Sequence, residues 1–203
     1  MSLTSIFFTF FFYISVLIFI TGVSYKIVQY WQTPAPLKIP IAPAPLNRSG
    51  VLLRIAREVF LFQSLFKASK WTWIFGWSFH LALVLLFFRH LVYFWPGEIP
   101  TILLKTEPLK YAAYPLIFGL LGLLGRRLFV DRVRYISAPS DYLMLLLLIV
   151  IGGSGMLMTF AQNHPNMLLV KNFAEGLITF NWSELPGEFL FLMHIFLVFL
   201  LIA

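Results

Sequence analysis

The sequence has no cysteine among its 203 residues. The chain by itself can therefore form neither a disulfide nor a cysteine-ligated iron–sulfur cluster, and any thiol chemistry must belong to partners. Charged residues are also scarce, at 11% of the chain, whereas hydrophobic residues make up 60% and phenylalanine alone occurs 23 times. This balance excludes a soluble globular domain and indicates an all-α, polytopic membrane protein.

Five apolar stretches predict a bundle of five transmembrane helices in a single membrane domain covering residues 1–203. The first stretch lacks the basic start and the small-residue cleavage site of a signal peptide, so we expect an uncleaved span. From Phe189 to Ala203 the last stretch covers about 22 Å, less than the roughly 30 Å of a hydrocarbon core, and we expect it to continue beyond Ala203. The predicted spans are residues 3–28, 72–94, 111–125, 142–160 and 187–203.

Three segments that connect the spans have compositions that predict a particular structure. Residues 33–48 contain five of the 12 prolines and predict an extended linker. Residues 50–70 carry charges at helical spacing among apolar residues, which is typical of an interfacial amphipathic helix. Residues 167–180 predict a short helix on the surface.

The basic residues are concentrated in two of the connections between spans. Seven basic residues and one acid lie between Lys26 and Lys70, and four basic residues and one acid lie between Arg126 and Arg134. The link that follows the fourth span holds one basic residue and three acids. Because cytoplasmic connections are rich in lysine and arginine, the N-terminus is predicted to lie outside. The net charge of +7 then reflects topology and gives no reason to expect nucleic acid as a partner.

Three of the four histidines fall within predicted spans. His80 and His90 are ten positions apart in the second span, which places them about 15 Å apart along a helix and about 80° apart around it. His194 lies about seven residues into the fifth span, at a depth below the outer surface that matches His90. The fourth, His164, sits in a connecting loop and is predicted to be solvated.

Imidazoles inside a membrane are costly unless they are paired, bound or turned inward. The matched depth of His90 and His194 on two helices is what two axial ligands of one haem iron require, so we predict that these residues form such a pair. His80 has no suitably placed partner, so a second haem is either absent or ligated by a residue after Ala203. The alternative is a cofactor-free scaffold or transport subunit whose histidines pack across helices or relay protons.

Some other residues in the predicted spans have two interpretations each. Arg89 could pair with a haem propionate or could extend toward the membrane interface as a snorkelling arginine. Small-residue stripes could leave room for a porphyrin, although close helix packing is favoured. These stripes are Gly119, Gly122 and Gly125, and Gly152, Gly153 and Gly155.

The segment from Gly119 to Leu157 resembles the gamma (cytochrome b) subunit of respiratory nitrate reductases. The specific part is a basic loop followed by an acid that opens the next span. Residues 58–73 and the Arg89–His90 pair are similar to one branch of that family, represented by DsrM, the membrane cytochrome b of the complex associated with dissimilatory sulfite reductase. The loop residues that carry the resemblance are Arg126, Arg127, Phe129, Arg132, Arg134 and Asp141.

This resemblance implies a multi-pass subunit of the cell (cytoplasmic, inner) membrane with two haems b. His90 and His194 would ligate the outer haem, and His80 would provide one ligand of the inner haem. The subunit would exchange electrons between the quinone pool and a cytoplasmic iron–sulfur partner, alongside other membrane and periplasmic subunits, in a respiratory or sulfur-metabolism complex. It would be part of a quinone-linked oxidoreductase and not a complete enzyme.

The resemblance leaves further roles open. Lys105 and Lys110, in the predicted outer connection, are candidates for handling protons at a quinone, although exposed charges there also serve as membrane anchors. The basic inner loops could dock a soluble redox partner, and topology alone also explains them. Within the family, the alternative to the DsrM branch is a nitrate reductase gamma subunit.

Overall fold

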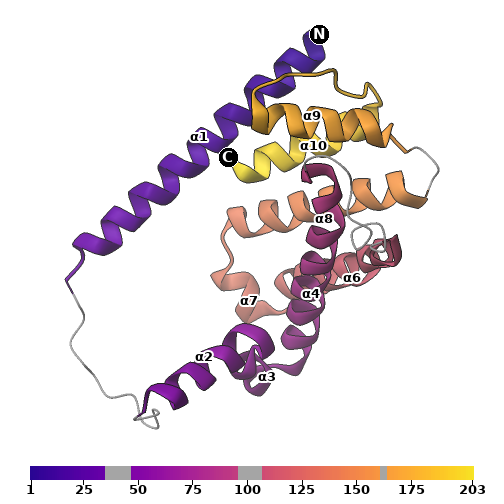
Figure 1. Cartoon of the computed structure of the whole chain (residues 1–203). Helices are drawn as coiled ribbons and strands as arrows, with labels where there is room; N and C mark the ends of the chain where they lie inside the picture. The colour runs from indigo at the N-terminus through magenta and orange to yellow at the C-terminus, as the bar shows by residue number, and fades with distance from the viewer. Residues whose placement is uncertain (35–46, 96–106, 161–163) are drawn as a thin grey trace.

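The computed structural model describes residues 1–34, 47–95, 107–160 and 164–203, and this part of the chain is helical with no strand (Figure 1). The predicted all-α membrane fold is confirmed. Most of the predicted proline linker lies outside the described residues. The elements in chain order are α1 (Leu3–Gln32), α2 (Arg48–Leu61), α3 (Gln63–Ala68), α4 (Lys70–Phe94), η1 (Glu107–Ala112), α6 (Ala113–Phe129), α7 (Asp131–Ile136), α8 (Pro139–Phe160), α9 (Met167–Thr179) and α10 (Phe189–Ile202).

Four helical stretches within the described residues are long and apolar enough to cross a membrane. Each of them contains one of the first four predicted spans. The fifth predicted span corresponds to α10, which is apolar but only 14 residues long, or about 21 Å. The four long stretches are Leu3–Gln32, Lys70–Phe94, Pro108–Phe129 and Pro139–Phe160.

Packing joins the helices in a series: α4 lies on α6, α6 on α8, α8 on α10, and α10 on α1. One hydrophobic cluster lies between α4 and α6, around the fully buried Leu120, with leucines of α8 packed against it. A second cluster joins α1, α9 and α10 through Phe8, Phe173 and Phe199. Helix α9 also packs on α4. It is the short helix predicted for residues 167–180, but part of it is buried.

The contact between α4 and α6 depends on two glycines of the predicted small-residue stripe. A Cβ atom on Gly119 would lie 2.6 Å from the backbone oxygen of Phe75, and one on Gly122 would overlap the Phe75 ring. Only residues without a side chain allow this approach of the two backbones. At these two positions the structure favours close helix packing over room for a cofactor.

The single interfacial helix predicted for residues 50–70 is instead two helices with a sharp turn between them. Phe62 separates α2 from α3 and adopts a left-handed backbone with φ of 49°. Glu58 stabilises the turn by accepting hydrogen bonds from the backbone and the hydroxyl of Ser64, at 3.0 and 2.6 Å. The indole of Trp73 donates to the carbonyl oxygen of Leu61 at 2.7 Å. The prediction of one helix was wrong because these contacts favour a turn that local periodicity does not reveal.

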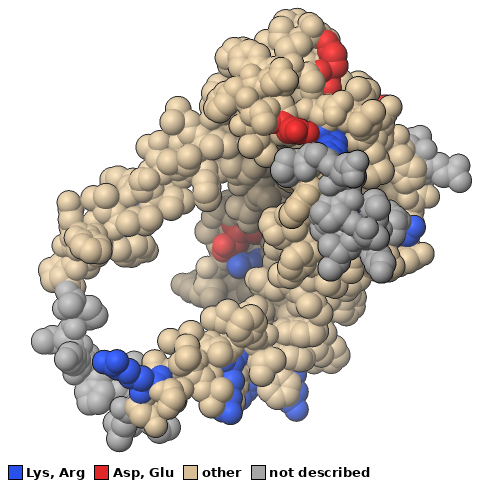
Figure 2. All heavy atoms as spheres, viewed as in Figure 1, with Lys and Arg blue, Asp and Glu red and all other residues tan. Residues whose placement is uncertain are grey.

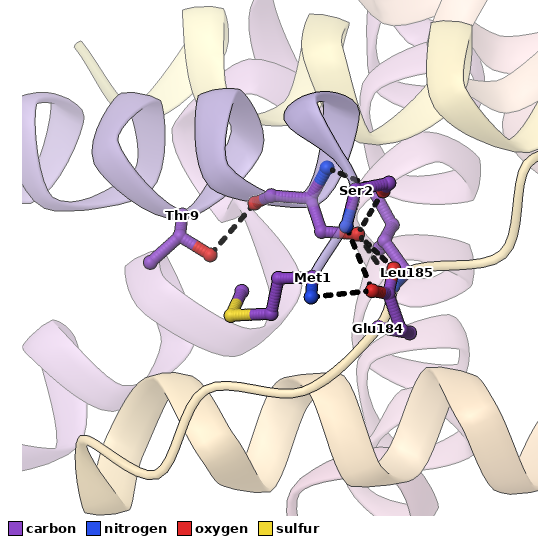
Figure 3. A network of polar contacts seen from close by, with 6 residues as sticks. Met1, Ser2, Thr9, Glu184 and Leu185 are labelled. Atoms are coloured by element: carbon purple, nitrogen blue, oxygen red, sulfur yellow. Dashed lines mark hydrogen bonds and ion pairs between the residues drawn. The ribbon is translucent and has the colours of Figure 1, made fainter.

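A second cluster of polar contacts attaches the start of α1 to the segment before α10 (Figure 3). The hydroxyl of Ser5 is fully buried, donates to the carboxylate of Glu184 at 2.9 Å and accepts from the backbone of Leu185 at 3.0 Å. The ammonium of Met1 lies 3.1 Å from the same carboxylate. These bonds hold residues 180 positions apart in sequence side by side, so that the first and last helices pack together.

Charge is distributed unevenly over the surface (Figure 2). Several lysine and arginine side chains lie at the end of the molecule where α2 and α3 lie, and acidic side chains appear near the opposite end, by α9 and the start of α1. A few charges of both signs are also visible between these ends. This separation agrees with the charge pattern of the sequence. The direction in which the bundle crosses the membrane stays a prediction.

Candidate functional site

The two histidines of α4 share one hydrogen-bonding arrangement. His80 Nδ1 lies 2.7 Å from the carbonyl oxygen of Gly76, and His90 Nδ1 lies 2.7 Å from that of Leu86. A carbonyl oxygen can only accept, so each Nδ1 carries the hydrogen and Nε2 is the unprotonated nitrogen of the neutral ring. Metal-bound histidines typically show this arrangement, because the outer bond fixes the tautomer and the ring orientation.

The third histidine is held from a neighbouring helix. His194 Nδ1, on α10, lies 2.8 Å from the hydroxyl oxygen of Ser154 on α8. Ser154 is only 3% exposed, and its hydroxyl also lies 2.9 Å from the carbonyl oxygen of Ile151. Gly155 sits against the same imidazole, since a Cβ atom there would be 3.2 Å from His194 Cε1. The ring of His194 therefore packs against the backbone of α8, with Nδ1 occupied.

The predicted axial pair, His90 and His194, is divided between α4 and α10. His90 is exposed in the isolated chain, with the ring of Tyr93 at 6.0 Å between centroids. Extensive packing connects α4 to α10 through α6 and α8. His90 and His194 therefore lie on helices that are linked mainly through others, and their pairing at one haem stays a prediction.

His80 lies in a different environment, among aromatic rings. The ring of Phe62 contacts it edge-on at 5.1 Å between centroids, and Phe79 does so at 4.7 Å. Phe62 is the left-handed residue that separates α2 from α3, so the turn in the interfacial segment brings an aromatic side chain onto this histidine.

The remaining predicted residues fall in different places. Arg89 is partly buried, one position before His90 on α4, and Lys110 is partly buried with its Nζ 5.6 Å from the centroid of the Tyr111 ring. Lys105 lies outside the described residues. His164 is exposed in the segment before α9, as predicted for a loop histidine.

Sequence reasoning missed Ser154, and it considered Gly155 only as a member of a small-residue stripe that serves helix packing or leaves room for a porphyrin. The available signal was a small polar residue in an otherwise apolar span, but the sequence does not show which side of α8 faces His194. Pairing residues 40 positions apart requires the packing of α8 on α10.

The side chains of this site suit haem iron better than a metal ion that is held by protein side chains alone. No group of three or more histidine, aspartate or glutamate side chains that could hold a metal ion occurs in the part of the chain that the structure describes. Haem iron needs only axial ligands from the protein, and imidazole is a usual one. Neutral imidazoles with Nδ1 occupied and Nε2 unprotonated fit that requirement.

Comparison with known proteins agrees with this chemistry. Residues 50–203 match the family described as nitrate reductase gamma subunit. The chain is 30% identical, over 237 aligned residues, to the Hdr-like menaquinol oxidoreductase cytochrome b-like subunit of Archaeoglobus profundus; the match covers 94% of this chain and 70% of the relative. It is also 30% identical to the protein of the same name from Archaeoglobus fulgidus, where the match covers 83% of this chain but 63% of the relative.

Proposed function

This chain belongs to the nitrate reductase gamma subunit family, and we propose that it is a haem-binding cytochrome b subunit of a membrane-bound quinol oxidoreductase complex. It would exchange electrons between the quinone pool and a cytoplasmic iron–sulfur partner. The chain would work as one subunit of that complex and not as an enzyme by itself. The names of the two relatives favour menaquinol as the quinol.

The observation that carries the proposal is the common hydrogen-bonding state of three histidines on the apolar helices α4 and α10. His80, His90 and His194 each have Nδ1 in a hydrogen bond of 2.7 to 2.8 Å. Buried or membrane-facing imidazoles without a ligand are unfavourable. Three rings with the same nitrogen occupied support a shared role as ligands through Nε2.

Each residue has a defined task in this proposal. When bound, a haem supplies reversible one-electron chemistry. His90 and His194 would hold the outer haem as its axial pair, and Arg89 would pair with one of its propionates. His80 would provide one ligand of an inner haem, with Phe62 and Phe79 keeping water away from that side of the imidazole.

The outer end of the bundle would handle the protons that a quinol releases. Lys110 and Lys105 are candidates there because a cation near the quinone ring favours loss of a proton. Lys110 stacks on Tyr111, which places its ammonium group beside an aromatic surface at the start of the third long apolar stretch.

Two kinds of partner complex are candidates within the family. The Arg89–His90 pair and residues 58–73 favour the DsrM branch, and with it a complex of sulfur metabolism. A nitrate reductase complex is the alternative. The two differ in which iron–sulfur and periplasmic subunits co-purify with the tagged chain from native membranes.

A spectroscopic experiment tests the proposal. The purified chain in detergent should give the reduced-minus-oxidised absorption difference of a b-type haem, and a water-soluble menaquinol analogue should produce the reduced bands. A chain purified from haem-replete cells that shows no haem absorption would contradict the proposal and favour a cofactor-free scaffold. Haem that is reduced by dithionite but never by quinols would contradict its link to the quinone pool.

A further inference from the structure

We propose that Ser154 is a positioning residue that fixes the tautomer and orientation of His194 and thereby lowers the reduction potential of the haem held by that histidine. This inference rests on the proposed function. Ser154 touches neither the iron nor a substrate, and it acts only through the imidazole of His194.

The direction of the hydrogen bond follows from counting hydrogens. The Ser154 hydroxyl has one hydrogen and two neighbours, the Ile151 carbonyl oxygen at 2.9 Å and His194 Nδ1 at 2.8 Å. The carbonyl oxygen can only accept, so it takes the hydroxyl hydrogen. Ser154 Oγ must then accept from Nδ1–H of His194, which leaves Nε2 as the nitrogen with a free lone pair.

The opposite arrangement would remove the ligand. If the hydroxyl donated to Nδ1, the neutral ring would carry its hydrogen on Nε2 and could not bind iron there. It would also leave the carbonyl of Ile151 without this bond.

His194 differs from the α4 histidines in where its restraint comes from. His80 and His90 bond to carbonyls four residues earlier in their own helix, so their Nδ1 partners are independent of helix packing. His194 is restrained across a helix interface, by a serine 40 positions away. Gly155 permits this contact, because a Cβ atom at 155 would crowd the ring at 3.2 Å.

The chemical consequence has a definite sign. An acceptor on Nδ1–H draws that hydrogen away from the ring and makes Nε2 a stronger donor to iron. A stronger donor stabilises the ferric state more than the ferrous state and lowers the potential. Removing the serine oxygen should therefore raise the potential of the haem at His194 and weaken its retention.

The test compares three variants of the whole chain, purified with bound haem and titrated by redox potentiometry under optical detection. Ser154→Ala should raise the midpoint potential of one haem component and lower haem retention by about tenfold, the low end of the range for residues that orient a metal ligand. Ser154→Thr keeps a hydroxyl and should restore both values. Thr159→Val is the matched control and should leave the potential unchanged. Among the described residues, the Thr159 hydroxyl bonds within α8, to the Gly155 carbonyl oxygen at 2.8 Å.

The possible outcomes distinguish the proposed role of Ser154 from the proposed haem-binding function. Absence of haem from the unmodified chain contradicts the proposed function. Normal haem in the unmodified chain, with the same potential and retention in Ser154→Ala, contradicts only the role of Ser154. If Ser154→Ala is not recovered in folded form, Ser154→Cys, with its weaker acceptor, should shift the potential in the same direction, and an unchanged potential there overturns the inference.

Discussion

Arg127 and Asp141 form an ion pair that joins α6 to α8, with Arg127 Nη1 3.0 Å from Asp141 Oδ2. The same guanidinium nitrogen donates to the hydroxyl of Ser137 at 2.8 Å, and the carboxylate accepts from the backbone of Ala138 at 3.0 Å. Both charged residues belong to the loop motif that carries the family resemblance. Their contacts close the connection between two long apolar helices, which gives this part of the motif a structural role.

Loss of that ion pair should destabilise the bundle measurably. Arg127→Ala removes charge-assisted bonds to two side chains that are only partly exposed, and we expect a loss of about 1–2 kcal/mol in the free energy of unfolding. The matched control is Arg134→Ala, because the Arg134–Asp131 pair is more exposed, at 62% and 88%, and should contribute less than about 0.5 kcal/mol. Denaturant unfolding in detergent measures both, and equal losses would contradict the structural role.

The glycine contact between α4 and α6 gives a second stability prediction. Gly119→Ala places a Cβ atom 2.6 Å from a backbone oxygen of α4, so the helices must separate, at an expected cost of about 1–3 kcal/mol. Gly153→Ala is the control, because nothing lies within 4 Å of the added Cβ atom. The control should unfold at the same denaturant concentration as the unmodified chain, or at a higher one. A Gly119→Ala variant as stable as Gly153→Ala would show that α4 and α6 do not pack this closely.

Acid should loosen the attachment of α1 to the segment before α10. The Met1 ammonium, and after it the Ser5 hydroxyl, lower the pKa of Glu184 from 4.5 to about 2. Because the pKa is lower in the folded state, the carboxylate stabilises the fold above about pH 4.5, and this contribution is lost as the pH falls toward 2.

Glu184→Gln should therefore lower the melting temperature at pH 7, and the difference from the unmodified chain should shrink between pH 4.5 and pH 2. Glu188→Gln is the matched control, because Glu188 precedes α10 without a side-chain capping bond. Thermal unfolding at several pH values measures the effect. A Glu184→Gln deficit that persists unchanged at pH 2 would contradict the ionic origin of the contact.

Much of the fold followed from the sequence because long apolar runs and charged connections are local signals. They predicted the helical membrane class and the four long apolar stretches. The turn at Phe62 was not predicted, because a phenylalanine with positive φ has no local signature and depends on Glu58, Ser64 and Trp73. The short helix α7 also differs from the loop that the sequence predicts between the third and fourth spans.

Part of the candidate site could likewise be predicted from the sequence, and part could not. Spacing on one helix, as for His80 and His90, can be read from the sequence, and so can depth within a span, as for His194. The hydrogen bond between His194 and Ser154 could not be predicted, because it depends on the rotation of α8 and α10 about their own axes. Axial ligation itself stays a prediction.

The most direct test of the account is the haem content of histidine variants. His90→Ala and His194→Ala should each remove the same b-type haem component from the reduced-minus-oxidised spectrum, because both ligands serve one iron. His164→Ala, at an exposed loop histidine, should leave the spectrum unchanged. If His90→Ala and His194→Ala retain the full spectrum, or if they remove two different components, the pairing of these two histidines on one haem is contradicted.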